Sequence, residues 1–420
     1  MDIISALSDD LLLRILSFVP TKDVMATCLL SKKWRFLWTS VSRLDYYHYN
    51  DSVVDTGDYK NFSQFVYRSL LSNKAPVLDK LSLKLCADCP FIDVELWISI
   101  ALSHRVRELQ IDVVSKEGYL SLPSSLYTSE TLEILSLSNS VVLNVPLSVC
   151  LPSLKALSLD RVDYTDNVTL PRLLSGSPNL EVLFMRRHHG DATTDVIVIA
   201  PSLKSLTMLD IDSEACGRFV VDTPSLKHLE IGDFAVYSFR QMENMPALEK
   251  AGVYMRSSVV TQKFLKALTS VHRLSLYLSL SEVMHPSGMT FNQLVNLDLY
   301  TFHEGWWDLL TCMLQDSPNL RFLRLLKLIT DSKSKETPVG WRPPSSVPEC
   351  LLCSLEAFVW NRYNGGQGDR EMAKYLLNNA ACLKTARFSP ASTDLEEKYQ
   401  MLKVLSSVPT TSASCQLLFD

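Results

Sequence analysis

The chain contains little glycine, no long apolar run and no excess of basic residues. Only 13 of its 420 residues are Gly, less than half of the usual share of about 7%, which excludes collagen-like and Gly-rich linker compositions. No run of 18 apolar residues occurs, so we expect no membrane-spanning helix. Lys+Arg 41 against Asp+Glu 46 gives a net charge of −5, which argues against a dedicated nucleic-acid binder.

An export signal and a metal-binding pattern are also missing. The start of the chain carries the acidic pair Asp9 and Asp10 where a signal peptide requires positive charge. We therefore expect reduced thiols and a location in the cytoplasm or nucleus, not secretion. The two CxxC pairs, Cys86/Cys89 and Cys350/Cys353, lie far apart and lack a His pair at zinc-finger spacing. Buried structural cysteines are favoured over a zinc site, and we expect no metal and no cofactor.

Leucine is abundant, and its spacing organises most of the chain. There are 69 Leu residues, and the pattern L-x-x-L-x-L recurs, with apolar substitutions, at intervals of 22 to 28 residues. Most intervals match the 20–29 residues of a leucine-rich repeat, which contributes one short strand to a curved sheet. The eleven patterns begin at Leu78, Val106, Leu132, Leu154, Leu180, Leu203, Leu226, Leu248, Val271, Leu294 and Leu320.

Such repeats predict an α/β solenoid. A single strand with its return segment cannot bury its leucines alone, so neighbouring repeats stack into one continuous core. Alternation along the strand places Leu135 and Leu137 in the core and Ile134, Ser136 and Ser138 on the sheet surface. We expect parallel strands on the concave face and helices or loops outside. A face of this kind binds other molecules more often than it catalyses reactions.

Two sets of residues are candidates for binding a substrate. Tyr254, Tyr277 and Tyr300 follow one another at 23-residue steps, so they should stand on adjacent strands about 5 Å apart. They form either an aromatic binding strip or a set of rings that pack only against each other. Arg186 and Arg187 belong to a basic patch that could meet an acidic segment. The histidines and aspartates that follow them are read as solvated loop residues, in preference to a metal site.

The first forty-five residues have a different pattern. Ser8 is a suitable N-cap for a helix that Pro20 closes. Its apolar residues cover an arc of about 220°, whereas a helix packed on one core needs a stripe of little more than 100°. The unit is too small to bury so wide an arc, so an apolar face should await a partner. The arc comprises Leu11, Leu12, Leu13, Ile15, Leu16, Phe18 and Val19.

The motif Leu7-Ser-Asp-Asp-Leu-Leu, followed by Ile15 to Asp23 and by Leu30-Ser-Lys-Lys-Trp-Arg-Phe-Leu-Trp38, resembles the F-box of plant F-box/leucine-rich-repeat proteins. The resemblance implies docking on the Skp-type adaptor of a cullin-based ubiquitin ligase. One departure is Ser8, where the family usually has Pro, and we expect it to weaken docking at most. Carried over by position, the adaptor-facing residues include Leu7, Leu11, Leu12, Ile15, Leu16, Val24 and Trp34.

The C-terminal region resembles the FBD module that follows plant leucine-rich repeats. The similarity rests on Trp341-Arg-Pro-Pro344, Val347 to Leu351, Leu355 to Trp360, Tyr363-Asn-Gly365 and Tyr375 to Ala380. Two degenerate strand patterns, at 355–360 and 383–388, indicate that this module continues and caps the solenoid. The predicted organisation is an F-box at 1–45, a helical linker or N-terminal cap at 46–77, repeats at 78–330, a loop at 331–348 and the FBD at 349–420.

These patterns predict a substrate receptor and not an enzyme. No nucleophile elbow and no Cys–His signature is present, so no catalytic residue is assigned. The resemblance implies a subunit of a ubiquitin ligase that binds a Skp-type adaptor, through it a cullin, and an unidentified protein substrate. The alternative is a protein-interaction scaffold whose F-box no longer assembles a ligase. Neither hypothesis requires nucleic acid or a membrane.

Overall fold

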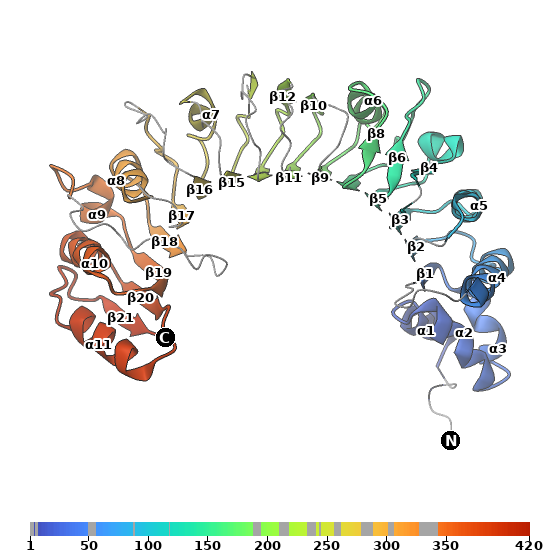
Figure 1. Ribbon diagram of the computed structural model, residues 1–420, viewed down its shortest axis with the longest axis horizontal. Helices are drawn as coiled ribbons and strands as arrows, with labels where there is room; N and C mark the ends of the chain where they lie inside the picture. The colour runs from blue at the N-terminus through green and yellow to red at the C-terminus, as the bar shows by residue number, and fades with distance from the viewer. Residues whose placement is uncertain are drawn as a thin grey trace. The chain divides into compact units, whose positions relative to one another are not determined.

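The computed structural model comprises two compact units, Met1–Lys204 and Ser205–Asp420. Both repeat a short strand followed by a helix or loop, and within each unit the helices lie on one side of the strands (Figure 1). Among the residues that the structure describes, no helix is both long and apolar enough to cross a bilayer. The described residues are 4, 7–48, 56–86, 89–116, 118–187, 195–209, 218–232, 241–242, 245–255, 262–278, 289–300, 306–326 and 343–420.

The first unit begins with three short helices and continues with six strands of the main sheet. Its helices are α1 (Asp9–Leu16), α2 (Thr21–Ala26), α3 (Trp34–Leu37), α4 (Thr56–Ser72), α5 (Phe91–Ser103) and α6 (Thr169–Ser175), with 3-10 turns η2 (Thr27–Leu29), η3 (Trp38–Ser40) and η4 (Ser124–Thr128). Its main strands are β1 (Arg43–His48), β2 (Lys80–Leu85), β3 (Glu108–Val113), β5 (Ile134–Asn139), β7 (Ala156–Asp160) and β9 (Val182–Arg186). Shorter strands are β4 (Leu120–Ser121), β6 (Val141–Leu143), β8 (Asp163–Tyr164) and β10 (Val196–Ile199).

The second unit has the same plan and ends in the predicted FBD region. Its main strands are β11 (Ser205–Leu209), β13 (His228–Gly232), β15 (Lys250–Met255), β16 (Arg273–Leu278), β17 (Asn296–Tyr300), β18 (Phe322–Leu326), β19 (Ala357–Tyr363), β20 (Thr385–Pro390) and β21 (Gln416–Phe419). Strands β12 (Phe219–Asp222) and β14 (Gln241–Met242) form a separate pair. Its helices are α7 (Gln262–Ala267), α8 (Trp306–Asp316), α9 (Glu349–Cys353), α10 (Gln367–Asn379) and α11 (Leu395–Ser406).

Every pair of neighbouring main strands within a unit is parallel, which confirms the predicted α/β repeat architecture. Parallel strands need a crossover of a dozen or more residues, and the repeat length supplies one between successive strands. The side-chain alternation is also as predicted: Leu135 and Leu137 are buried, while Ile134 beside them is exposed. The surface formed by the outward side chains of the main strands is called the open face below.

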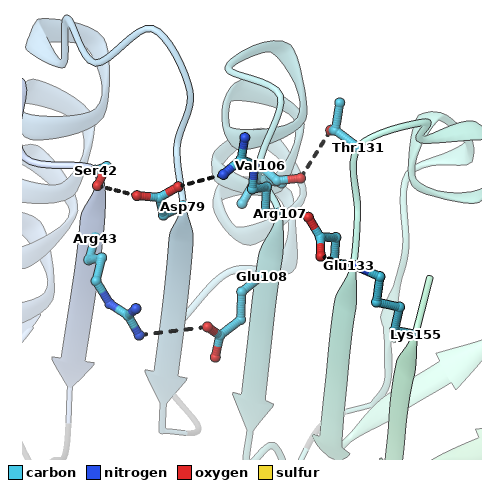
Figure 2. A network of polar contacts seen from close by, with 9 residues as sticks. All are labelled: Ser42, Arg43, Asp79, Val106, Arg107, Glu108, Thr131, Glu133 and Lys155. Carbon is cyan, nitrogen blue, oxygen red and sulfur yellow. Dashed lines mark hydrogen bonds and ion pairs between the residues drawn. The ribbon is translucent and has the colours of Figure 1, made fainter. Parts of the chain in front are cut away.

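A row of charged residues immediately before the strands, called the edge row here, connects neighbouring repeats. In the first unit Arg107 pairs with Asp79 at 3.4 Å, and Ser42 donates to the same carboxylate at 2.6 Å (Figure 2). Lys155 pairs with Glu133 at 2.7 Å two repeats further along. Exposed pairs of this kind stabilise by at most about 1 kcal/mol each. They therefore add little to the stability of the array.

Backbone hydrogen bonds between the same residues also connect neighbouring repeats. Glu133 N donates to Arg107 O at 2.7 Å, and Lys155 N donates to Glu133 O at 2.8 Å. Side chains reinforce these turns, since Thr131 Oγ1 donates to Val106 O at 3.1 Å (Figure 2). Each repeat is thus hydrogen-bonded to the preceding repeat at the start of its strand.

The N-terminal helices are joined directly to the first strand. Val41 belongs to the core of the helical unit, and β1 begins two residues later. Thr21 Oγ1 accepts a hydrogen bond from Asp45 N at 2.7 Å, which occupies a donor of β1. Asn73 Nδ2 donates to Val41 O at 2.8 Å from the segment after α4. The helical unit therefore closes the first end of the sheet without an intervening linker.

Helix α4 occupies the predicted cap region and is anchored by one carboxylate. Asp93, in the first turn of α5, accepts hydrogen bonds from the hydroxyls of Tyr59 and Tyr67, the latter at 2.9 Å. Burial is the main cause that raises the pKa of Tyr67 to about 12, followed by its hydrogen bond to Asp93. Both hydroxyls therefore remain donors at neutral pH, and they connect two successive crossovers outside the sheet.

The C-terminal region continues the sheet of the second unit, as predicted. Strands β19 and β20 add to β18, and Phe358, Trp360 and Phe388 form a buried aromatic cluster beneath them. Strand β21 and helix α11 complete the region, and the sequence patterns did not predict either one. Asp394 caps α11 by accepting from the backbone N–H groups of Glu396 and Glu397.

Removing one core leucine should destabilise the array measurably. Leu137 is fully buried, so Leu137→Ala should cost about 2–5 kcal/mol of the free energy of unfolding. Ile134 is 38% exposed in the same strand, and Ile134→Ala should change it by less than about 1 kcal/mol. Urea unfolding followed by circular dichroism measures both. Equal shifts of the two midpoints would contradict the assigned alternation.

Candidate functional site

The helical unit at the N-terminus has a small core of its own. Its centre consists of Leu12, Leu16, Val24 and Trp34, which are 0% to 5% exposed. These four residues were predicted to face an adaptor, and in the structure they are buried in the core of the unit. Leu7, from the same predicted set, is half-buried against this core. Their direct role in docking remains a prediction.

A second apolar stripe of the same unit is exposed. Leu11 and Ile15, also from the predicted set, are 49% and 47% exposed, and Phe18 is 82% exposed. The steps of four and three residues place them along one side of α1 and the turn that follows it. This confirms that α1 carries more apolar surface than its own core uses. Further exposed apolar residues that the sequence did not single out are Leu29, Leu30 and Phe36.

Ser8 stands at the N-cap of α1, but its side chain makes no capping hydrogen bond. A different residue fastens this end of the helix. Lys33 Nζ donates to Leu7 O at 2.5 Å and lies 3.3 Å from Asp9 Oδ1. Lys33 thus connects the N-terminal end of α1 with the residue that precedes α3.

The predicted tyrosine column exists in the second unit, but its three rings have different environments. Tyr254 pairs with Tyr277 in the strand register, and Tyr277 is buried. Tyr300 contacts both rings edge-on, at centroid distances of 5.8 Å to Tyr254 and 5.6 Å to Tyr277. Mutual packing thus accounts for Tyr277, whereas Tyr254 and Tyr300 stay half-exposed on the open face.

Tyr254 folds back along its own strand. A Cβ atom at Gly252 would lie 3.0 Å from the Tyr254 ring, so the absence of a side chain at Gly252 makes room for it. Burial is the main cause that raises the pKa of Tyr254 to about 12, and the charge of Glu230 contributes. Burial and Asp298 raise the pKa of Tyr300 as well. Both hydroxyls are therefore neutral and able to donate at physiological pH.

These tyrosines border a hollow of about 450 Å³ in the open face. A volume of this size is in the range that accepts a small ligand or a few side chains. Arg324 Nε lies 3.7 Å from Asp298 Oδ1 across its floor, and that oxygen accepts no hydrogen bond. The floor is formed by the third position of six successive strands: Thr207, Glu230, Gly252, Ser275, Asp298 and Arg324.

The two predicted substrate-binding arginines lie in different environments. Arg186 is on the open face of the first unit, 3.5 Å from Asp160, with its guanidinium over the Phe184 ring. Arg187 is only 4% exposed. Alternation along the strand explains the difference, because consecutive side chains point to opposite faces. His188, His189 and Asp191, which follow them, lie outside the described residues.

Each CxxC motif has one buried cysteine, while Cys86 is half-buried and Cys353 is exposed. Cys89 and Cys350 are buried, and Cys350 Sγ donates to Leu314 O at 3.1 Å. Burial raises the pKa of the Cys350 thiol to about 12. Over the described part of the chain, no three His, Cys, Asp or Glu side chains converge in a metal-binding group.

Comparison with known proteins covers every region of this fold. Residues 4–46 match the F-box domain, residues 94–249 match the LRR repeats of FBD-associated F-box protein At5g56370, and residues 342–388 match the FBD. The chain is 60% identical to F-box/FBD/LRR-repeat protein At4g26340 of Arabidopsis thaliana, over 100% of both chains. It is 45% identical to the putative F-box/FBD/LRR-repeat protein At4g26350 of the same plant, over 100% of this chain and 99% of the relative.

The environments of the second cysteine pair predict unequal reactivity. At pH 8.5 iodoacetamide should modify the exposed Cys353, while the buried Cys350 remains a protonated thiol and reacts only after denaturation. Mass spectrometry of the peptide that contains both residues measures the two modifications. Equal labelling of Cys350 and Cys353 in the folded protein would show that the buried assignment is wrong.

Proposed function

The chain belongs to the F-box/FBD/LRR-repeat protein family, and from this premise we propose that it is the substrate-recognition subunit of a Skp–cullin–F-box ubiquitin ligase. In this role the F-box binds a Skp-type adaptor and through it a cullin. The repeats bind a target protein by their open face. Proteins of this family are in general adaptors without a catalytic site, and the ubiquitin transfer takes place elsewhere in the complex.

The observation that carries the proposal is the separation of two apolar surfaces in the F-box. One surface, around Leu12 and Leu16, holds the unit together, and the other, formed by Leu11, Ile15 and Phe18, remains exposed. Exposed apolar side chains on adjacent helical turns gain free energy when a partner covers them, about 1.5–3 kcal/mol for each fully buried residue. The stripe is therefore the surface on which we place the adaptor.

The mechanism is an increase in effective concentration. Holding the target on the same complex as the transfer machinery makes the transfer step intramolecular. The chain itself then needs a rigid binding surface and a docking surface, but no acid, base or nucleophile. The second hypothesis, a scaffold that binds proteins without assembling a ligase, shares the open face and differs only in the use of the exposed stripe.

Charge introduced into the exposed stripe should abolish adaptor binding without unfolding the F-box. Leu11→Asp/Ile15→Asp removes two apolar contacts and places two charges in the interface, so we expect adaptor affinity to fall by at least about a hundredfold. Co-purification of the full chain with a Skp-type adaptor and cullin measures this. Leu16→Asp would be a poor test, because Leu16 is 2% exposed and its loss would disrupt the core.

The control is Leu147→Asp, which makes the same change at a residue 89% exposed in the repeats. It should retain adaptor and cullin as well as the unmodified chain. If the unmodified chain retains neither protein, the scaffold hypothesis replaces the ligase. If the Leu11→Asp/Ile15→Asp variant keeps wild-type affinity and circular dichroism, the docking stripe is wrongly placed.

A further inference from the structure

Three basic residues stand next to one another on the open face of the second unit. His228, Lys250 and Arg273 each hold the first position of their strand, and the register pairs His228 with Lys250 and Lys250 with Arg273. All three side chains are exposed. The Cβ atoms of opposed residues lie about 5 Å apart, and like charges directly opposite one another are destabilising. This trio is called the basic row below.

In the first unit, two basic residues in the same strand position are paired with a carboxylate of the chain itself. Arg43 and Lys80 also occupy the first position of adjacent strands, and Glu108 follows on the next strand. Figure 2 shows Arg43 and Glu108. Glu108 lies 3.6 Å from Arg43 and 3.2 Å from Lys80, so one carboxylate serves both cations. In the second unit the strand after Arg273 brings the neutral Asn296 to that position. Within the described residues, Lys250 and Arg273 have no ion pair.

The carboxylates nearest to Lys250 and Arg273 have other partners or lie further along their strands. Glu249, in the edge row, already pairs with Lys227 at 3.0 Å. Glu230 and Asp298 lie two positions further along their strands, on the floor of the hollow, and Asp298 is paired with Arg324. Among the described residues, the first strand position of the open face thus presents Lys250 and Arg273 without an ion pair, beside a hollow that Tyr254 and Tyr300 border.

We propose that the basic row and the adjoining hollow bind an acidic segment of the target protein, with an acidic side chain on Lys250 and Arg273 and a bulky side chain in the hollow. This deepens the receptor function proposed above and rests on it. The first and third strand positions are separated by two residues, about 6.6 Å, which is also the spacing of alternate side chains in an extended peptide. The motif read by this surface is therefore an acidic and a bulky residue separated by one residue.

The hollow contributes selectivity and the basic row contributes charge. Tyr254 and Tyr300 offer ring edges and neutral hydroxyls to an aromatic or aliphatic side chain. Glu230 repels an anion from the floor of the hollow, so the acidic side chain is confined to the basic row. The two parts of the site therefore select both the kinds of residue in the bound segment and their order.

Selection from a random peptide display library on the immobilised full chain tests the proposal. Enriched peptides should carry Asp or Glu two positions from a bulky residue. A fluorescent peptide with the enriched sequence should bind Lys250→Gln/Arg273→Gln at least tenfold more weakly, measured by anisotropy. Tyr254→Ala/Tyr300→Ala should reduce the preference for the bulky residue and retain that for the acid.

The matched control is Lys155→Gln/Lys384→Gln, which removes two charges from edge-row pairs of similar exposure and should bind the peptide as the unmodified chain does. Because the basic row is strained by repulsion, Lys250→Gln/Arg273→Gln should keep or raise the melting temperature. The proposal is overturned if no acidic preference emerges, if both double variants bind equally, or if inorganic phosphate alone competes as well as the unlabelled peptide. The assay contains no adaptor, so it is independent of the test of ligase assembly.

Discussion

The structure depends on one constraint: a strand with its return segment cannot bury its own leucines. Each repeat must complete the core of its neighbour, and the pattern residues are accordingly almost inaccessible, as at Leu132, Leu157 and Leu183. The same dependence makes the two ends of the array a problem, because the last repeat on each side has no neighbour. The F-box helices cover β1 at one end, and the FBD region adds β19, β20 and β21 to the sheet of the second unit. Two modules that differ in sequence thus share a physical task, which is to end a stack of repeats.

Periodicity made much of this predictable from the sequence, and the failures have physical reasons. Strands of the L-x-x-L-x-L type were found because the pattern repeats. Strand β1 was missed because only Leu44 and Tyr46 alternate there and the F-box resemblance ends at the same place. Strand β21, Gln416–Phe419, has an irregular pattern and is partly exposed, so no alternation marks it. Local propensity is weak where a strand is held mainly by its neighbour.

The candidate site residues were less predictable from the sequence than the fold. A helical arc of apolar residues identifies a helix with two faces, but not which face meets its own unit, so Leu12 and Leu11 could not be told apart from spacing alone. Likewise, the 23-residue period placed three tyrosines in one column but could not show that Gly252 gives the Tyr254 ring room to fold back. The basic row was readable in principle. It lies at the first strand position, four residues before the tyrosine column. Its members are recognised as cross-strand neighbours only once the strand register is known.

The division of the repeats into rows has a consequence for how such receptors diversify. The core rows carry most of the stability, the edge row joins neighbouring repeats, and the exposed side chains of the open face contribute less. Exposed substitutions away from caps and ion pairs usually change the free energy of unfolding by less than about 0.5 kcal/mol. A change at Lys250 or Arg273 therefore alters what the surface attracts at almost no cost to folding. The binding specificity of the open face can therefore change by point mutation with little loss of stability.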